Sequence, residues 1–452
     1  MRLLSLMWKV LCVLSFVAAA ATAQLMPVGT QFTVNTVTTA NGSMISATEP
    51  AVAVSPSGSF LVVWNRFDRG YVGAFARLYD HIGAPIGDEF QVSDSHGLFP
   101  VVAAAGADVF FVVWIEGESV FGQRYGSSGT AQGDAFLVGS AGTPVSAGAH
   151  VACNGTGHCV VVWPFAADGN NGIAAQRYDS SGAPAGTELQ VSVDSAQLGY
   201  PHTSVDPEGN FLIVWQRFDP DVTDSAIYSQ LYRADATPHG APLRIAITGN
   251  RTGYDATGVD VAADPMGKFF VTWDSQVDAA ASHFAPMPGT IFAQQLDGNG
   301  AALGSVVQIT KPETYLGFFP AVASDGGPNF LLTWREITLG NTERISAQYL
   351  GPKAAAVDPS FQVTSSNRTT NSVDAASNMR GDLVVVWDSQ GRILAQRYRA
   401  EIVPPVPAAG ESGGGCAVAP PPLGSSVGWL SVLALVWTLL RAWRSADLSR
   451  FR

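Results

Sequence analysis

Residues 50–92 read PAVAVSPSGSFLVVWNRFDRGYVGAFARLYDHIGAPIGDEFQV. A short apolar stretch precedes a Gly turn, and a longer apolar run then ends in Trp64. That run is rich in β-branched residues and has no polar alternation, which is typical of a strand buried on both faces. Two further apolar stretches follow, separated by a D-x-x-G turn that favours a tight hairpin. The unit therefore predicts four short antiparallel strands.

The same unit occurs seven times along the chain. Successive Trp-ending runs are 49 to 61 residues apart. Four strands per unit, repeated at this period, are typical of the blades of a β-propeller, because one such sheet cannot cover both of its apolar faces alone. The tryptophans that end the runs are Trp64, Trp114, Trp163, Trp215, Trp273, Trp334 and Trp387.

The start of the mature sequence supplies a strand that the last unit lacks. Six units end in a segment of the type Phe90-Gln91-Val92, but the seventh continues into a Pro/Gly-rich stretch. The missing segment is found at 31–34, which contains Phe32. We expect an all-β, seven-bladed β-propeller over 24–400, closed by this N-terminal strand beside 393–398. Such closure would remove exposed sheet edges.

Six of the seven strands that follow the Trp runs carry Gln at one position, and the first carries Arg77. These amides could form a ring of ligand-binding groups. We favour a structural role, in which each buried amide bonds to neighbouring backbone. The residues are Gln123, Gln176, Gln230, Gln294, Gln348 and Gln396.

The units resemble the V-V-W … A-Q-R-Y-D … G-x-x-F-x-V repeats of exported bacterial proteins, most of which have no assigned function. The resemblance covers residues 27–400. It implies the propeller fold and an extracytoplasmic location. It implies no family active site.

Residues 1–23 have the features of a secretory signal peptide. Arg2 and Lys9 flank the start of a short apolar run, and the small residues Ala21-Thr22-Ala23 fit a cleavage site after Ala23. The run is short for a spanning helix. We therefore expect the protein to be exported.

The other end divides into a Pro/Gly-rich linker, 401–423, and an apolar helix with a basic end, 424–452. The linker contains Gly414, Gly415 and Cys416. This layout resembles the C-terminal sorting signals of Gram-negative surface proteins, which implies cleavage near 413–416 and display on, or release from, the cell surface. A retained membrane anchor is the alternative, and modification of Cys416 stays open.

Charge and cysteine content limit the partners. A formal net charge of −12 argues against nucleic acid, which needs clustered Lys and Arg. Cys153 and Cys159 flank a turn and predict a disulfide in an oxidising compartment. A metal site at this C-x5-C with His158 lacks further ligands. We expect a monomer with no metal and no cofactor.

Two families of long loops at one end of the propeller are the candidate ligand-binding region. One is aromatic and would form a stacking platform or plug the clefts between blades. The other carries charge just past each Trp and would bind a ligand, act as acid and base, or merely be solvated. The candidates are Phe99, Tyr200, His202, Tyr254, Tyr315 and Phe318, and Arg66, Asp68, Arg217, Asp219, Arg335 and Glu336.

No catalytic motif stands out, so the sequence favours a non-catalytic module that binds a glycan or protein. The alternative is a sialidase-like glycosidase or a lyase. DPEGNFLIVW at 206–215 partly resembles the S-x-D-x-G-x-x-x-W turn of sialidases. A purely structural envelope component is a third reading. Convergence of Arg66, Arg217 or Arg335 with two carboxylates and a Tyr in one pocket would favour the enzyme.

Overall fold

The computed structural model describes residues 22–36, 39–40, 43–68, 71–93, 96–140, 148–167, 170–194, 197–218, 225–249, 258–276, 289–310, 315–338, 342–364 and 372–403. These belong to the first of two units, Met1–Pro404 and Pro405–Arg452. The predicted signal peptide up to residue 21 and the predicted linker and C-terminal helix from 404 lie outside the described residues. Within the described ranges, no helix is long and apolar enough to cross a membrane.

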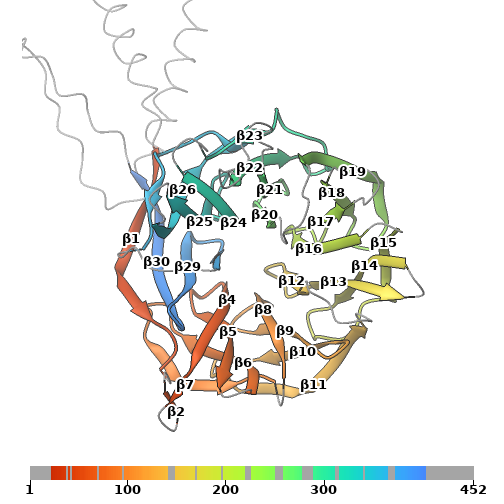
Figure 1. Cartoon of the computed structure of the whole chain (residues 1–452). Coiled ribbons are helices and arrows are strands. Elements are labelled where there is room, and N and C mark those ends of the chain that lie inside the picture. The colour runs from red at the N-terminus through yellow and green to blue at the C-terminus, as the bar shows by residue number, and fades with distance from the viewer. Residues whose placement is uncertain are drawn as a thin grey trace, which may run out of the picture. The chain divides into compact units, whose positions relative to one another are not determined.

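Seven four-stranded antiparallel sheets form a ring of blades, and this confirms the predicted all-β propeller (Figure 1). Within a blade the chain runs from an inner strand to the Trp strand, then to the Gln strand and the outer strand. The only described helix is the short η1 (Pro352–Ala354). A hairpin of β2 (Thr39–Ala40) and β3 (Ser43–Met44) precedes blade 1.

The strands of the seven blades, in order from the inner to the outer strand, have the following bounds. Blade 1 comprises β4 (Ser46–Val54), β5 (Phe60–Asp68), β6 (Tyr71–Tyr79) and β7 (Pro85–Gln91). Blade 2 comprises β8 (Leu98–Ala104), β9 (Phe110–Glu116), β10 (Ser119–Tyr125) and β11 (Ala131–Ser140). Blade 3 comprises β12 (His150–Cys153), β13 (Cys159–Ala167), β14 (Asn170–Tyr178) and β15 (Leu189–Asp194). Blade 4 comprises β16 (Gln197–Val205), β17 (Phe211–Phe218), β18 (Ser225–Tyr232) and β19 (Pro238–Gly249). Blade 5 comprises β20 (Val259–Ala263), β21 (Phe269–Gln276), β22 (Gly289–Leu296) and β23 (Val307–Gln308). Blade 6 comprises β24 (Tyr315–Ser324), β25 (Phe330–Thr338), β26 (Glu343–Leu350) and β27 (Phe361–Gln362). Blade 7 comprises β28 (Val373–Ser377), β29 (Asp382–Ser389), β30 (Arg392–Val403) and β1 (Thr22–Thr33).

The hydrophobic core lies between the blades. All seven Trp side chains are at most 2 % exposed. One cluster, for example, combines Leu61 and Val63 of blade 1 with Trp114 of blade 2. The Trp strands are therefore buried on both faces, as their sequence predicts, and each sheet is covered by its two neighbours.

The ring closes between the two ends of the described chain. Phe32 in β1 pairs with Ala395 in β30, and Figure 1 shows these strands side by side. Just beyond β1, the Val34 N–H donates to the Ile393 carbonyl oxygen (2.8 Å), and the Ile393 N–H donates to Asn35 Oδ1 (2.8 Å). The predicted closure by the N-terminal strand is thus confirmed.

Blade 7 extends slightly beyond the predicted propeller bounds. β30 continues to Val403, and β1 begins at Thr22, where Ala23 pairs with Ile402. The predicted processing after Ala23 would remove two residues of β1 and leave the pairing of Phe32 in place.

The repeated Gln side chains fasten each outer strand to its blade, as predicted. In blade 3, Gln176 Nε2 donates to the carbonyl oxygens of Arg177 (2.8 Å) and Gly186 (3.2 Å). Gly186 has φ 89° and lies where the chain bulges before β15. Gln396 makes the same contact with Gly29 of β1 at 3.3 Å, so the closing strand is held like the others.

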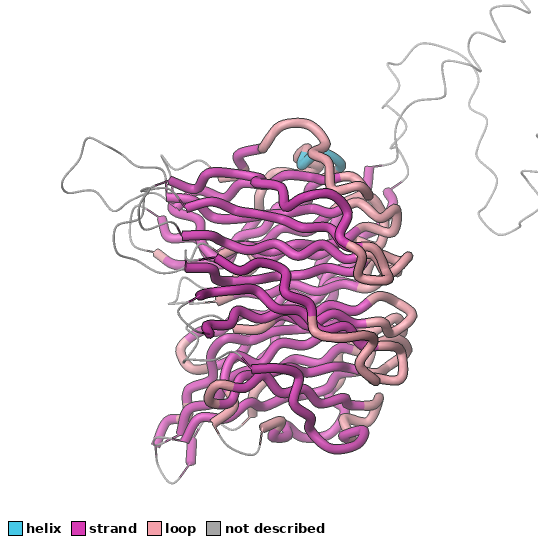
Figure 2. The backbone as a smooth tube through the Cα atoms, turned by 90° about the vertical axis from the view of Figure 1, so that its right-hand side faces the viewer, coloured by secondary structure: helices cyan, strands magenta, loops and turns pink. Residues whose placement is uncertain are grey.

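The hairpin turns gather along one side of the sheets in Figure 2. The turn after β6 shows why the D-x-x-G sequence forms them. Asp80 Oδ1 accepts the N–H groups of Ile82 and Ala84, and Gly83 has φ 86°. Side-chain capping and a left-handed Gly therefore fix the turn locally.

Candidate functional site

The residues at one repeated position of the seven inner strands form a layer around the middle of the ring. In every blade this residue pairs with the residue that precedes the Trp. Three blades place Ala or Val there, and four place a titratable side chain. In blade order the residues are Ala51, Val101, His150, His202, Asp260, Ala321 and Asp374.

The three titratable residues of consecutive blades 3, 4 and 5 meet. His202 Nδ1 is 3.0 Å from Asp260 Oδ1, and the rings of His150 and His202 have their centroids 4.3 Å apart. The Thr203 N–H donates to His150 Nδ1 at 3.3 Å. One metal-ligating atom from each of these three side chains lies within 4.8 Å of the other two.

The two aspartates tie adjacent inner strands together across the layer. Asp260 Oδ2 accepts the Val322 N–H (2.8 Å), and Asp374 Oδ2 accepts the Val52 N–H (2.8 Å). An inner strand has one unpaired edge, so these carboxylates satisfy backbone donors that the sheet leaves open. The polar layer therefore has a structural role in joining blades 5 to 6 and 7 to 1.

Burial changes the protonation of two members of this layer. Burial, reinforced by the charge of Asp260, raises the pKa of Asp374 to about 7. Burial and the neighbouring His202 lower the pKa of His150 to about 3, so this imidazole is neutral near pH 7. Such perturbed groups at a cavity are candidates for function.

A cavity of about 370 Å³ begins at this layer and extends along the inner strands to their hairpin turns. Val and Ala are the commonest residues of its walls, and its outer end is bordered by Pro56, Thr156, Pro207 and Met379. Among the described residues that line it, none is Arg, Lys, Glu or Tyr. The cavity therefore contains carboxyl and imidazole groups but no fixed positive charge.

The predicted aromatic residues lie near the opposite ends of the inner strands. Phe99 is half-buried in β8, next to Gly148, and Phe318 is half-buried in β24, next to Gly289. His202 belongs to the polar layer described above. Tyr200 lies in β16 and Tyr315 in β24, and Tyr254 lies outside the described residues.

Of the predicted charged residues, three have ion pairs within their own blades. In blade 1 Arg66 contacts Glu89 (3.5 Å), and in blade 6 Arg335 contacts Glu343 (3.2 Å), while Glu336 is buried against Arg344. Asp68 ends β5, Arg217 is in β17, and Asp219 lies outside the described residues. Arg66 and Arg335 are therefore each paired with a glutamate of their own blade.

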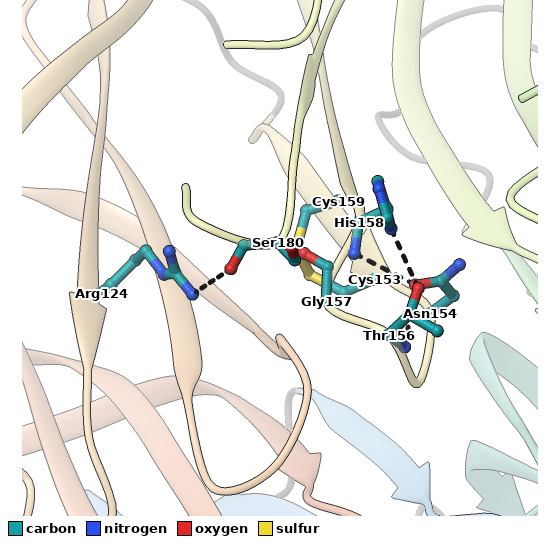
Figure 3. The surroundings of a disulfide bond; sticks show 8 residues. All are labelled: Arg124, Cys153, Asn154, Thr156, Gly157, His158, Cys159 and Ser180. Atoms are coloured by element: carbon teal, nitrogen blue, oxygen red, sulfur yellow. Dashed lines mark hydrogen bonds between the residues drawn. A yellow bond between two sulfur atoms is a disulfide. The ribbon is translucent and has the colours of Figure 1, made fainter. Parts of the chain in front are cut away.

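The predicted disulfide is present. Cys153 and Cys159 are bonded across the β12–β13 hairpin, as Figure 3 shows, and the adjacent Asn154 Oδ1 accepts the His158 N–H (3.1 Å). Because both sulfur atoms are in the disulfide, they do not form a C-x5-C metal site. Gly414, Gly415 and Cys416 lie outside the described residues.

Sequence reasoning missed His150, Asp260 and Asp374, and it considered His202 only as an aromatic residue of a loop. The available signal was a column in the repeat. Aligned on the Trp, the inner strands read AVAV, VVAA, HVAC, HTSV, DVAA, AVAS and DAAS. The first letter of each is the residue of the polar layer.

No protein-family model and no curated protein matches the chain. Solved structures similar to it include a protein of unknown function from Dyadobacter fermentans, with 10 % identity, a TM-score of 0.43, and coverage of 83 % of this chain and 99 % of that one. A polysaccharide lyase has 10 % identity, a TM-score of 0.48, and coverage of 84 % and 99 %. An α-L-arabinofuranosidase from Fusarium graminearum has 9 % identity, a TM-score of 0.45, and coverage of 84 % and 98 %.

Proposed function

We propose that this protein is an exported β-propeller, displayed on or released from the cell surface, that binds a glycan or protein ligand without transforming it. The observation that carries this proposal is the local pairing of Arg66 and Arg335. Arg66 and Arg335 contact glutamates of their own blades, and the cavity has no basic residue among its described lining. A sialidase-like site would instead bring several arginines to one carboxylate-binding pocket.

The channel cavity is the binding site that the described residues support. A volume of about 370 Å³ is within the usual range for small-ligand pockets. Apolar Val and Ala walls with a few fixed polar groups at one end provide contact area and orientation. A sugar unit or a projecting side chain of a protein ligand would enter between the hairpin turns that border it.

A binding experiment tests this site with a matched pair of variants. Thr156→Trp places a large side chain at the cavity border, whereas Thr130→Trp changes an exposed residue of the β10–β11 hairpin turn. The full chain is applied to a glycan array and to a library of surface proteins. We expect Thr156→Trp alone to weaken a bound ligand at least about tenfold; equal binding by both variants contradicts the proposed site.

A second candidate function is favoured by the carboxyl groups of the cavity. Asp374, with a pKa of about 7, lines the same cavity as Asp260, and two carboxyl groups in different environments are the usual acid and base of glycoside hydrolysis. A panel of fluorogenic glycosides and polysaccharides distinguishes the two functions. Turnover that is lost in Asp374→Asn would replace the non-catalytic proposal with an enzyme.

A further inference from the structure

We propose that His150, His202 and Asp260 bind one divalent transition-metal ion, with Zn²⁺ as the ion that their chemistry suits best. Two imidazoles and one carboxylate are a ligand set that Zn²⁺ accepts, with open positions left for water or a ligand. The three residues come from consecutive blades, and two of them, His150 and Asp260, line the channel cavity. The site is independent of the ligand proposed above, since metal binding is measured without that ligand.

The spacing of the donor atoms fits a metal ion. Two ligand atoms at about 2.1 Å from a tetrahedral Zn²⁺ are about 3.4 Å apart, so a small separation of the pair below would admit the ion. His202 Nδ1 and Asp260 Oδ1 are separated by 3.0 Å. The third ligand atom, from His150, lies within 4.8 Å of both, so a small rotation of one side chain completes the set.

The surroundings hold the carboxylate in position. Asp260 Oδ1 also accepts the Val261 N–H (2.8 Å), and Oδ2 accepts the Val322 N–H (2.8 Å). Such outer hydrogen bonds orient metal ligands and reduce the conformational freedom that binding would otherwise remove. On β12, His150 Nδ1 accepts the Thr203 N–H at 3.3 Å, a long hydrogen bond that a metal ion could replace at small cost.

The structural role of the layer does not require histidine, although His150 Nδ1 makes the same kind of contact between blades by accepting the Thr203 N–H (3.3 Å). Asp374 joins its inner strand to that of blade 1 through one carboxylate oxygen, and no imidazole is needed there. Blades 1, 2 and 6 have Ala51, Val101 and Ala321 at the same position, so the ring tolerates apolar residues in this layer. Two imidazoles beside a carboxylate are a ligand set found in metal sites.

The test uses the full chain without a histidine tag, with Cys12→Ser and Cys416→Ser so that thiols outside the propeller do not contribute. After treatment with a chelator, Zn²⁺ is titrated by calorimetry. We expect one ion per chain, and we expect His150→Gln and His202→Gln each to weaken binding at least about tenfold. The matched control is His158→Gln, because His158 is exposed in the β12–β13 turn and should leave the affinity unchanged.

Absence of saturable Zn²⁺ binding, or equal affinity in all three variants, overturns the site. If the His150 and His202 variants fail to fold, the site is tested instead by adding Cu²⁺ to the chain with its native histidines and recording how many imidazole nitrogens bind the ion. An electron paramagnetic resonance spectrum with coupling to two imidazole nitrogens supports the site. A spectrum with one coupled nitrogen, or with none, overturns it.

Discussion

Phe32, in the first strand of the propeller, pairs with Ala395 in its last strand. The Phe32 side chain also reaches blade 1, where its ring lies 5.4 Å from that of Tyr79 and 6.5 Å from that of Phe60. One residue thus joins the start of the chain to blade 7 and packs blade 7 against blade 1. The ring is closed by these contacts and by backbone hydrogen bonds, without a covalent link between the chain ends.

Phe32→Ala should loosen this closure. Loss of a partly buried ring is expected to lower the free energy of unfolding by about 2–3 kcal/mol. Hydrogen exchange should become faster at Ile393 and Ala395, because β30 loses its neighbour β1. Phe90→Ala is the matched control, since Phe90 contacts Tyr125 at 5.2 Å in the same way but belongs to a continuous blade. Unchanged protection of β30 in Phe32→Ala would contradict closure by this strand.

Gln176→Leu should weaken the attachment of an outer strand. The variant removes the side-chain N–H groups that donate to the carbonyl oxygens of Arg177 and Gly186, and both oxygens lose this hydrogen bond. We expect a loss of about 1–3 kcal/mol in the free energy of unfolding, measured by urea denaturation. Gln190→Leu, an exposed change on β15, should cost far less. Equal losses would mean that the amide does not fasten the strand.

The disulfide should contribute modestly to stability because it closes a short loop. Cys153→Ala with Cys159→Ala is expected to cost about 2 kcal/mol by restoring entropy to the unfolded chain. The unmodified protein under reducing conditions should match the double variant, and the reductant should not affect the variant itself. A larger loss, or one that reductant does not reproduce, would show that the two alanines disturb the hairpin directly.

The sequence predicted the fold well because its signals are local and repeated. Seven Trp strands, D-x-x-G turns and a displaced outer strand define the ring without knowledge of long-range contacts. The polar layer could not be predicted in the same way. His150, His202 and Asp260 lie in separate repeats, and their contact depends on the stagger between neighbouring inner strands, which no single repeat contains. The ion pairs of Arg66 and Arg335 could not be predicted for a related reason: each depends on which acidic residue of another strand lies beside the arginine in the folded blade.

Asp374 should make stability depend on pH. Its pKa is about 7 in the folded chain, above its ordinary value, because of burial and the charge of Asp260, while His202 acts in the opposite direction. Between about pH 4 and pH 7 the folded state therefore holds a proton that the unfolded state has lost. The stabilising contribution of this proton is complete at low pH and is lost as the pH rises through the folded pKa.

Asp374→Asn removes this dependence. The variant also loses a hydrogen bond to one backbone N–H, which lowers its free energy of unfolding equally at every pH. The informative quantity is therefore how the free energy of unfolding of the variant, minus that of the native chain, changes with pH. We expect the variant to gain stability relative to the native chain from pH 4 to pH 7, by up to about 1.4 kcal/mol per pH unit, and the difference to be constant above pH 8. Urea denaturation in the presence of a chelator measures it. Asp134→Asn, an exposed change on β11, is the control and should show a flat difference. A flat difference for Asp374→Asn as well would mean that this carboxyl group ionises normally in the folded chain.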